Sequence, residues 1–184
     1  MSVYNISATE VTDGAFNYCS SLAWFSSDTV TAITGYAPFS YCRSLSVFDA
    51  PNLKVIGDGD IFRECVALSS IDLHNVTEMK AGYVFAECSN LTSLQLDNVL
   101  SIGEYVFRDS YIRDLTLSSG LMHMHYGAFN SQDTAYDYDV GEYATGWHND
   151  VPDLTAVHIH NKSLDDIYNG ISRVSDSYYS KYDI

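Results

Sequence analysis

The chain has 184 residues, enough for one domain that buries about two thirds of its unfolded surface. Nine Lys and Arg against 24 Asp and Glu give a formal net charge of -15, which argues against nucleic acid and anionic membrane surfaces as partners. No stretch approaches the roughly 18 apolar residues of a membrane span, and no signal-peptide pattern opens the chain. A cytoplasmic or virion-associated location is therefore expected, or an extracellular one if the chain is a fragment.

Phenylalanine recurs along the chain with a period of 22 or 23 residues. The repeated positions are Phe16, Phe39, Phe62, Phe85, Phe107 and Phe129. In each of the first four units a Cys follows three residues later and a Leu three residues after that, as in Cys65 and Leu68. Apolar residues then alternate with polar ones, as at Ile71 and Leu73, which predicts a short strand.

A unit of this length cannot bury its own apolar face, whereas stacked units roughly 4.8 Å apart give each Phe and Leu a copy of itself to pack against. The period therefore predicts one repeat solenoid domain over residues 1–184, with a parallel β-sheet on one side. We expect residues 1–13 to start the stack, 14–130 to carry the repeats, 131–153 to form an acidic Tyr-rich insertion and 154–184 to supply a last strand and a capping helix.

The segments SIGEYVFRDS and GAFNYCSSL show the repeated unit most clearly. Their pattern resembles the BspA-like leucine-rich repeats, whose units run Ile-Gly, Ala-Phe, Cys, Leu, Ile and Leu. The resemblance covers about residues 11–130. It implies a leucine-rich repeat stack of the kind used as adhesins and recognition surfaces by bacteria, protists and phage particles, and it implies no enzyme.

The cysteines and histidines admit metal or disulfide interpretations. In-register rungs would bring neighbouring Cys within disulfide reach, but a spacing of 23 fits no zinc signature, so we expect a column of reduced, buried thiols. His123 with His125, and His158 with His160, each share one face of a strand and could bind zinc or copper. The pairs fall in different parts of the unit, so we expect solvated histidines and predict no metal and no cofactor.

The insertion alternates aromatic and acidic residues, a composition typical of recognition surfaces. Its candidate ligand-binding residues are Tyr136, Tyr138, Tyr143 and Trp147. An inert, locally packed insertion is the alternative. Calcium binding by its acidic residues is disfavoured, because the spacing of an EF-hand loop is absent.

A second candidate surface is the exposed face of the predicted sheet. The outward strand positions would form a column of Asp49, Asp72, Gln95, Thr116 and His158. Asp72 and Gln95 are the candidate ligand-binding residues of this column. A solvated sheet face needs no ligand, so both interpretations stay open.

The chain contains no nucleophile elbow, no phosphate-binding glycine loop and no His-Glu pair at helical spacing, so we expect no enzyme. The sequence instead predicts a non-enzymatic recognition or adhesion module that binds a protein or glycan. The alternative is a structural subunit of a phage virion, such as a decoration, fibre or host-recognition protein, which would be part of a larger assembly.

Overall fold

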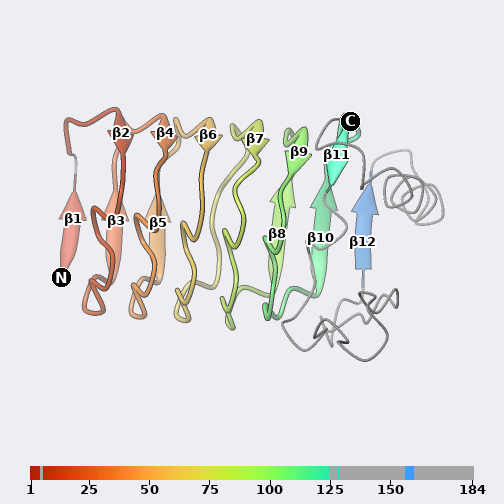
Figure 1. The fold of residues 1–184 in the computed structure, drawn as a ribbon. Helices are drawn as coiled ribbons and strands as arrows, with labels where there is room; N and C mark the ends of the chain where they lie inside the picture. The colour runs from red at the N-terminus through yellow and green to blue at the C-terminus, as the bar shows by residue number, and fades with distance from the viewer. Residues whose placement is uncertain (5, 125–127, 129–155, 160–184) are drawn as a thin grey trace, which may run out of the picture.

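The computed structural model describes residues 1–4, 6–124, 128 and 156–159. Each repeat unit makes one rung, and the rungs follow one another along a single axis (Figure 1). Residues 21 to 23 apart are therefore neighbours in space, as in the strand pairs Phe25 with Phe48 and Leu94 with Leu115. This arrangement confirms the solenoid that the period of the sequence predicts.

The longer strands pair in parallel along one side of the stack. Strands β1 (Ser2–Tyr4), β3 (Trp24–Ser26) and β5 (Val47–Asp49) form one three-stranded sheet, and β8 (Ser93–Leu96), β10 (Asp114–Leu117) and β12 (Ala156–Ile159) form another. The segment 70–73 lies between these two sheets in the order of the rungs. Within the described part of the chain it has no strand pairing, so the sheet is interrupted at the third rung.

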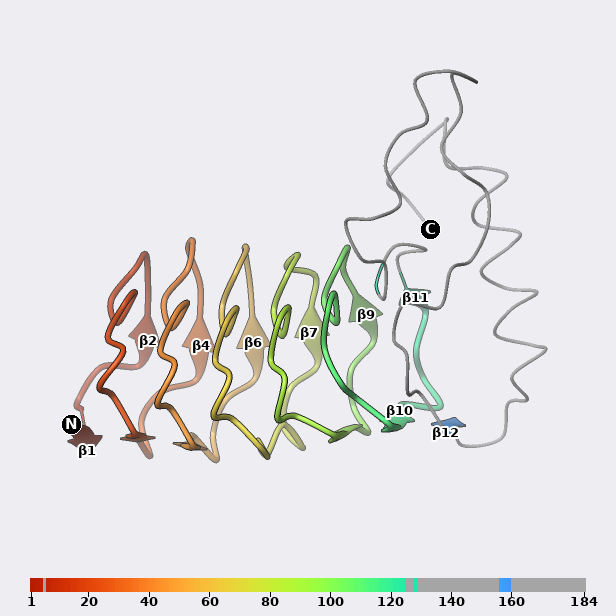
Figure 2. The same ribbon diagram turned by 90° about the horizontal axis from the view of Figure 1, so that it is seen from below.

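A second ladder of two-residue strands accompanies the first. It is a six-stranded parallel sheet of β2 (Glu10–Val11), β4 (Ala32–Ile33), β6 (Val55–Ile56), β7 (Glu78–Met79), β9 (Ser101–Ile102) and β11 (His123–Met124). Figure 2 shows these strands apart from the longer ones, across the cross-section of the stack. The repeat predicts a sheet on one side only, and pairing of the extended segments before each Phe adds this second ladder.

The core is a column of stacked phenylalanines with a second apolar column beside it. Phe39, Phe62 and Phe85 are fully buried, with consecutive ring centroids 5.5 Å and 5.6 Å apart and rings nearly parallel. Phe25 and Phe48 form the start of the second column and meet the first edge-on, as in the 4.9 Å contact of Phe25 with Phe39. After Phe48 the second column continues with aliphatic side chains: Ile71, Leu94 and Leu115.

The cysteines are free and serve the packing of the stack. Cys42, Cys65 and Cys88 are buried, and each thiol donates a hydrogen bond to the carbonyl of the Phe in the preceding rung, at 3.0, 3.2 and 3.1 Å. Burial raises the pKa of Cys42 and Cys88 to about 12, so both remain protonated donors. A Cys at this position therefore fills a small apolar site and also satisfies a buried carbonyl.

The corners around each Phe are held by hydrogen bonds that run from rung to rung. The amide of Phe16 donates to the carbonyl of Pro38 at 2.8 Å, and the amide of Tyr18 to that of Ser40 at 2.9 Å. The residue two positions after the Phe adopts a left-handed conformation, with φ of 58° at Tyr18 and 60° at Tyr41. Such a φ is unfavourable for a bulky residue, so the bonds to the next rung must maintain it.

Several predictions concern residues outside this description. The predicted capping helix, the insertion 131–153, His125 and His160 all fall there, and the division of the chain into segments stays a prediction. Strand β12 pairs in register with β10, opposite residues being Thr116 and His158. Among the described residues, no helix is long and apolar enough to cross a membrane.

Candidate functional site: a groove on the sheet face

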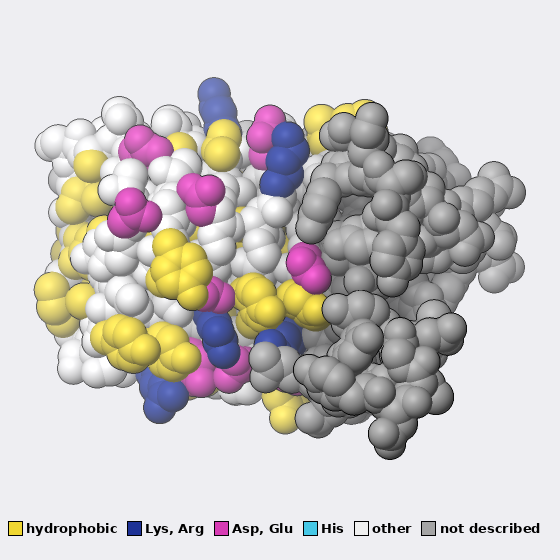
Figure 3. All heavy atoms as spheres, in the orientation of Figure 1, with side chains coloured by type: hydrophobic (Ala, Val, Ile, Leu, Met, Phe, Trp, Pro, Cys, Tyr) yellow, Lys and Arg dark blue, Asp and Glu magenta, His cyan; other side chains and the backbone are white. Residues whose placement is uncertain are grey.

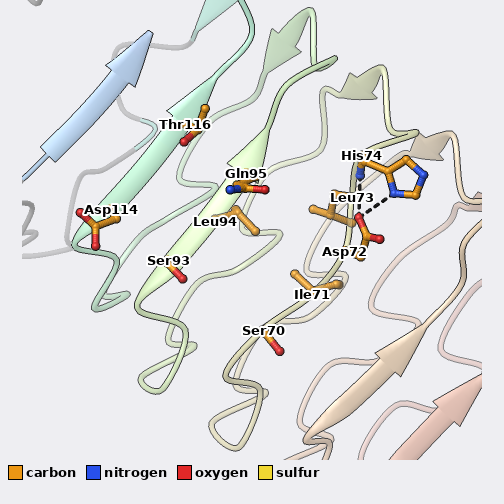
Figure 4. Close-up of a pocket in the computed structure, with 10 residues that line it drawn as sticks. All are labelled: Ser70, Ile71, Asp72, Leu73, His74, Ser93, Leu94, Gln95, Asp114 and Thr116. Carbon is orange, nitrogen blue, oxygen red and sulfur yellow. Dashed lines mark hydrogen bonds and ion pairs between the residues drawn. The ribbon is translucent and has the colours of Figure 1, made fainter. Parts of the chain in front are cut away.

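A groove of about 600 Å³ opens on the sheet face where the sheet is interrupted (Figure 4). Its lining comes from the unpaired segment and from strands β8 and β10. The lining residues are Ser70, Ile71, Asp72, Leu73, His74, Ser93, Leu94, Gln95, Asp114 and Thr116. The interruption thus converts a flat sheet face into a depression with polar walls.

The turn at Asp72 explains why the third rung forms no strand. One carboxylate oxygen, Oδ1, accepts a hydrogen bond from the backbone amide of His74 at 3.0 Å and another from its ring Nδ1 at 2.7 Å. An Asp that bonds the amide two residues later forms an Asx turn, which competes with strand pairing. The alternating pattern of Ile71 and Leu73 is retained, with Leu73 buried, but the segment forms no strand pairing with the described rungs on either side.

The same contacts fix the charge and orientation of the groove's polar groups. The backbone hydrogen bond from His74, followed by the side-chain bond, lowers the pKa of the Asp72 carboxyl, which is therefore ionised at neutral pH. Asn75 donates from Nδ2 to His74 Nε2 at 2.8 Å and to the carbonyl of Pro51 at 2.8 Å. This pattern fits a neutral His74 with its proton on Nδ1.

The groove has the chemistry of a binding site for hydrogen-bond donors. Asp72 and Asp114 lie on either side of Gln95 (Figure 4), and the half-buried Ile71 adds apolar surface. Two carboxylates and an amide oxygen can accept hydrogen bonds, and the Ile71 side chain can contact a hydrocarbon chain. A cluster of three or more His, Cys, Asp or Glu able to hold a metal ion is absent from the described residues.

The structure brings together two of the predicted site residues. Asp72 and Gln95, assigned from the sequence to one outward column, both line the groove. Tyr136, Tyr138, Tyr143 and Trp147 lie outside the described residues and stay predictions. His74 was not selected from the sequence, although its position two residues after Asp72 was a signal for an Asx turn.

The comparisons with known proteins agree with this architecture. The chain belongs to the family described as the BspA type leucine rich repeat region, which matches residues 9–135 in 6 copies. A crystal structure of a T. pallidum leucine-rich repeat protein is similar in fold, with a TM-score of 0.59 and 24% identity over 67% of this chain and 68% of that chain. No curated protein matches the chain. Leucine-rich repeats generally serve as binding scaffolds for proteins and are typically not enzymes.

Proposed function

We propose that this protein is a non-enzymatic recognition module that binds a partner protein through the groove on its sheet face. The observation that carries the proposal is the ionised carboxylate of Asp72, held in place by His74 at the edge of a groove that also contains Gln95 and Asp114. Because His74 already holds this carboxylate, less side-chain entropy is lost when a ligand binds.

A protein ligand fits the groove better than a glycan does. The lining combines carboxylates with the apolar surface of Ile71, which is half-buried. A lysine or arginine side chain has a hydrocarbon stem and a cationic head, so it can use both parts of this lining. The net charge of -15 would also accelerate the approach of a basic partner at low salt.

The test is a peptide selection followed by affinity measurements on matched variants. Peptides selected from a random library against the protein should be enriched in Lys and Arg, and isothermal titration calorimetry gives their Kd. Asp72→Asn should weaken binding about 10- to 100-fold, the range expected for loss of a charge-assisted hydrogen bond. Asp49→Asn is the control, because Asp49 is exposed on strand β5, one rung before the groove, and carries the same charge.

Three results would overturn the proposal. Equal weakening by both variants would mean that only the net charge matters. Selection of glycans but no peptides, in a parallel glycan array, would replace the ligand class. Loss of binding in Tyr138→Ala with Trp147→Ala, with Asp72→Asn neutral, would move the site to the insertion. The virion-subunit alternative is supported by no observation in the described part of the chain and stays a prediction.

A further inference from the structure

A second surface, rich in tyrosine, lies at the corner that precedes the strands in the first two rungs. It consists of Tyr18, Tyr36 and Tyr41 with the carboxylates of Asp58 and Asp60, and we call it the tyrosine surface. Tyr18 and Tyr36 are 68% and 65% exposed, which is unusual for rings of this size. Figure 3 shows hydrophobic, basic and acidic side chains intermixed on one face of the described molecule.

Each of the two exposed rings has one covered face. The Tyr18 ring stacks on Tyr41, with centroids 4.6 Å apart and planes 5° from parallel. The Tyr36 ring lies against Gly59, where an added Cβ would stand 3.5 Å from the ring carbon Cδ2. The other face of each ring is directed to solvent, so two flat aromatic faces are available to a ligand.

Further along the same corner, the chain covers its own tyrosines with arginines. The guanidinium carbons of Arg63 and Arg108 lie 5.7 Å and 5.6 Å from the centroid of Tyr83. Arg63 is also bonded to Glu87, with Nη2 and Oε1 2.9 Å apart. The protein thus combines a cation over a tyrosine with a carboxylate beside it, an attractive arrangement.

The first two rungs lack these arginines. The positions that follow the repeated Phe, occupied by Arg63 and Arg108 in later rungs, are Asn17 and Ser40 here. Within the described residues, the cation contacts with tyrosine rings involve Tyr41 and Tyr83 and leave Tyr18 and Tyr36 without one. Among the described residues, the rings of Tyr18 and Tyr36 are therefore exposed without the arginine that covers Tyr83 in the later rungs.

One oxygen of a buried carboxylate in this surface lacks a hydrogen-bond donor. Asp60 is 5% exposed, its Oδ1 accepts no hydrogen bond, and the nearest cation is Arg63 with Nη1 at 3.8 Å. The hydroxyl of Tyr36 is hydrogen-bonded to the Asp60 carboxylate, and this bond, with the charge of Asp60, raises the pKa of Tyr36. An additional N–H donor beside Tyr36 would offset the unfavourable burial of this oxygen.

We propose that the tyrosine surface binds an arginine side chain of a partner protein. The guanidinium lies over the open face of Tyr36 and donates a hydrogen bond to Asp60 after a small displacement of the ring. A planar guanidinium suits both contacts, because it stacks on aromatic rings and donates in its own plane. The inference does not depend on the groove, which has a separate set of residues.

The substitutions at tyrosine positions leave the net charge unchanged, so that general attraction to an acidic protein is equal among them. The probe is the peptide acetyl-Gly-Arg-Gly-Arg-Gly-amide, and its Kd is measured by NMR titration. Tyr36→Leu should weaken binding about 2- to 30-fold, the range expected for loss of a cation–π contact, whereas Tyr36→Phe should keep most of it. Tyr111→Leu is the control, because Tyr111 is 45% exposed and lies three rungs away.

In Asp72→Asn, the affinity read from the NMR shifts of residues around Tyr36 should stay nearly unchanged, whereas any binding read from the residues of the groove should weaken, which separates the two proposals. A loss in Tyr36→Leu no greater than the loss in Tyr111→Leu would overturn the site. Equal affinity for the matching lysine peptide would overturn the assignment to arginine. Circular dichroism melting of each variant confirms that a lost affinity does not come from unfolding.

Discussion

The two-column aromatic core predicts that equal substitutions in the Phe column have unequal effects along the stack. Phe39 and Phe85 are both fully buried, but their ring contacts differ. Phe39 stacks on Phe16 and Phe62 and also meets Phe25 and Phe48 edge-on, at 4.9 Å and 5.2 Å. Phe85 has only its two stacked neighbours, Phe62 and Phe107, among the ring pairs of the described residues.

Replacing either residue by leucine removes the same volume, so the loss of burial cancels in the comparison. Phe39→Leu additionally loses two edge-on pairs, each contributing about 0.5–1.5 kcal/mol. We therefore expect Phe39→Leu to lower the free energy of unfolding by about 1–3 kcal/mol more than Phe85→Leu. Urea denaturation followed by tryptophan fluorescence and circular dichroism measures this difference, provided that the two probes coincide and the m-values agree.

The reasoning would be refuted if the two variants were equally destabilised within the error of extrapolation. That result would mean that the edge-on contacts contribute nothing beyond apolar area. A larger effect at Phe85 would imply that the aliphatic half of the stack tolerates a cavity less well, contrary to the contacts described.

Two further predictions concern the thiols and one close backbone approach. Ellman's reagent at pH 8 should modify the half-buried Cys19 and leave the other three cysteines unmodified until denaturant is added. Burial raises the pKa of the thiols of Cys42, Cys65 and Cys88, so little reactive thiolate is present. Fast reaction of all four thiols in the folded protein would contradict the buried column. Gly103→Ala should destabilise by about 1–3 kcal/mol, because a Cβ there would meet the carbonyl oxygens of Lys80 and Ala81, whereas Gly57→Ala has ordinary contacts with Thr34 and should have little effect. Equal melting temperatures for the two alanine variants would show that the backbone yields at little cost.

The fold could be predicted because residues one period apart in the sequence are also the residues that pack against each other in the structure. Phe62 and Phe85 are 23 residues apart in the sequence and stack at 5.6 Å, so the repeat specifies which side chains are neighbours. The interruption at the third rung could not be predicted in this way. Ile71 and Leu73 alternate as Leu94 and Leu96 do in the next rung, and the hydrogen bonds that Asp72 accepts from His74 favour a turn locally over a strand.

The candidate sites were predicted less completely than the fold. Asp72 and Gln95 could be placed on one face by alternation alone, but the depression beside them follows from the turn. The tyrosine surface was missed, because its contacting pairs, such as Tyr18 with Tyr41, are 23 residues apart and have no common motif. Shifting the sequence by one period would have placed Tyr18 beside Tyr41 and Tyr36 near Asp60, so the signal was present in the register.

The interrupted sheet also has a mechanical consequence. Tension along the axis acts on every junction between rungs in series, and the junctions on either side of residues 70–73 lack strand pairing on the sheet side in the described chain. There the rungs are joined by the β4–β6 and β6–β7 ladders and by corner bonds such as that from the Phe62 amide to the Val84 carbonyl at 2.9 Å. Under force the stack should part at this line first, so a ligand seated in the groove would span the weakest junctions and raise the force needed to separate them.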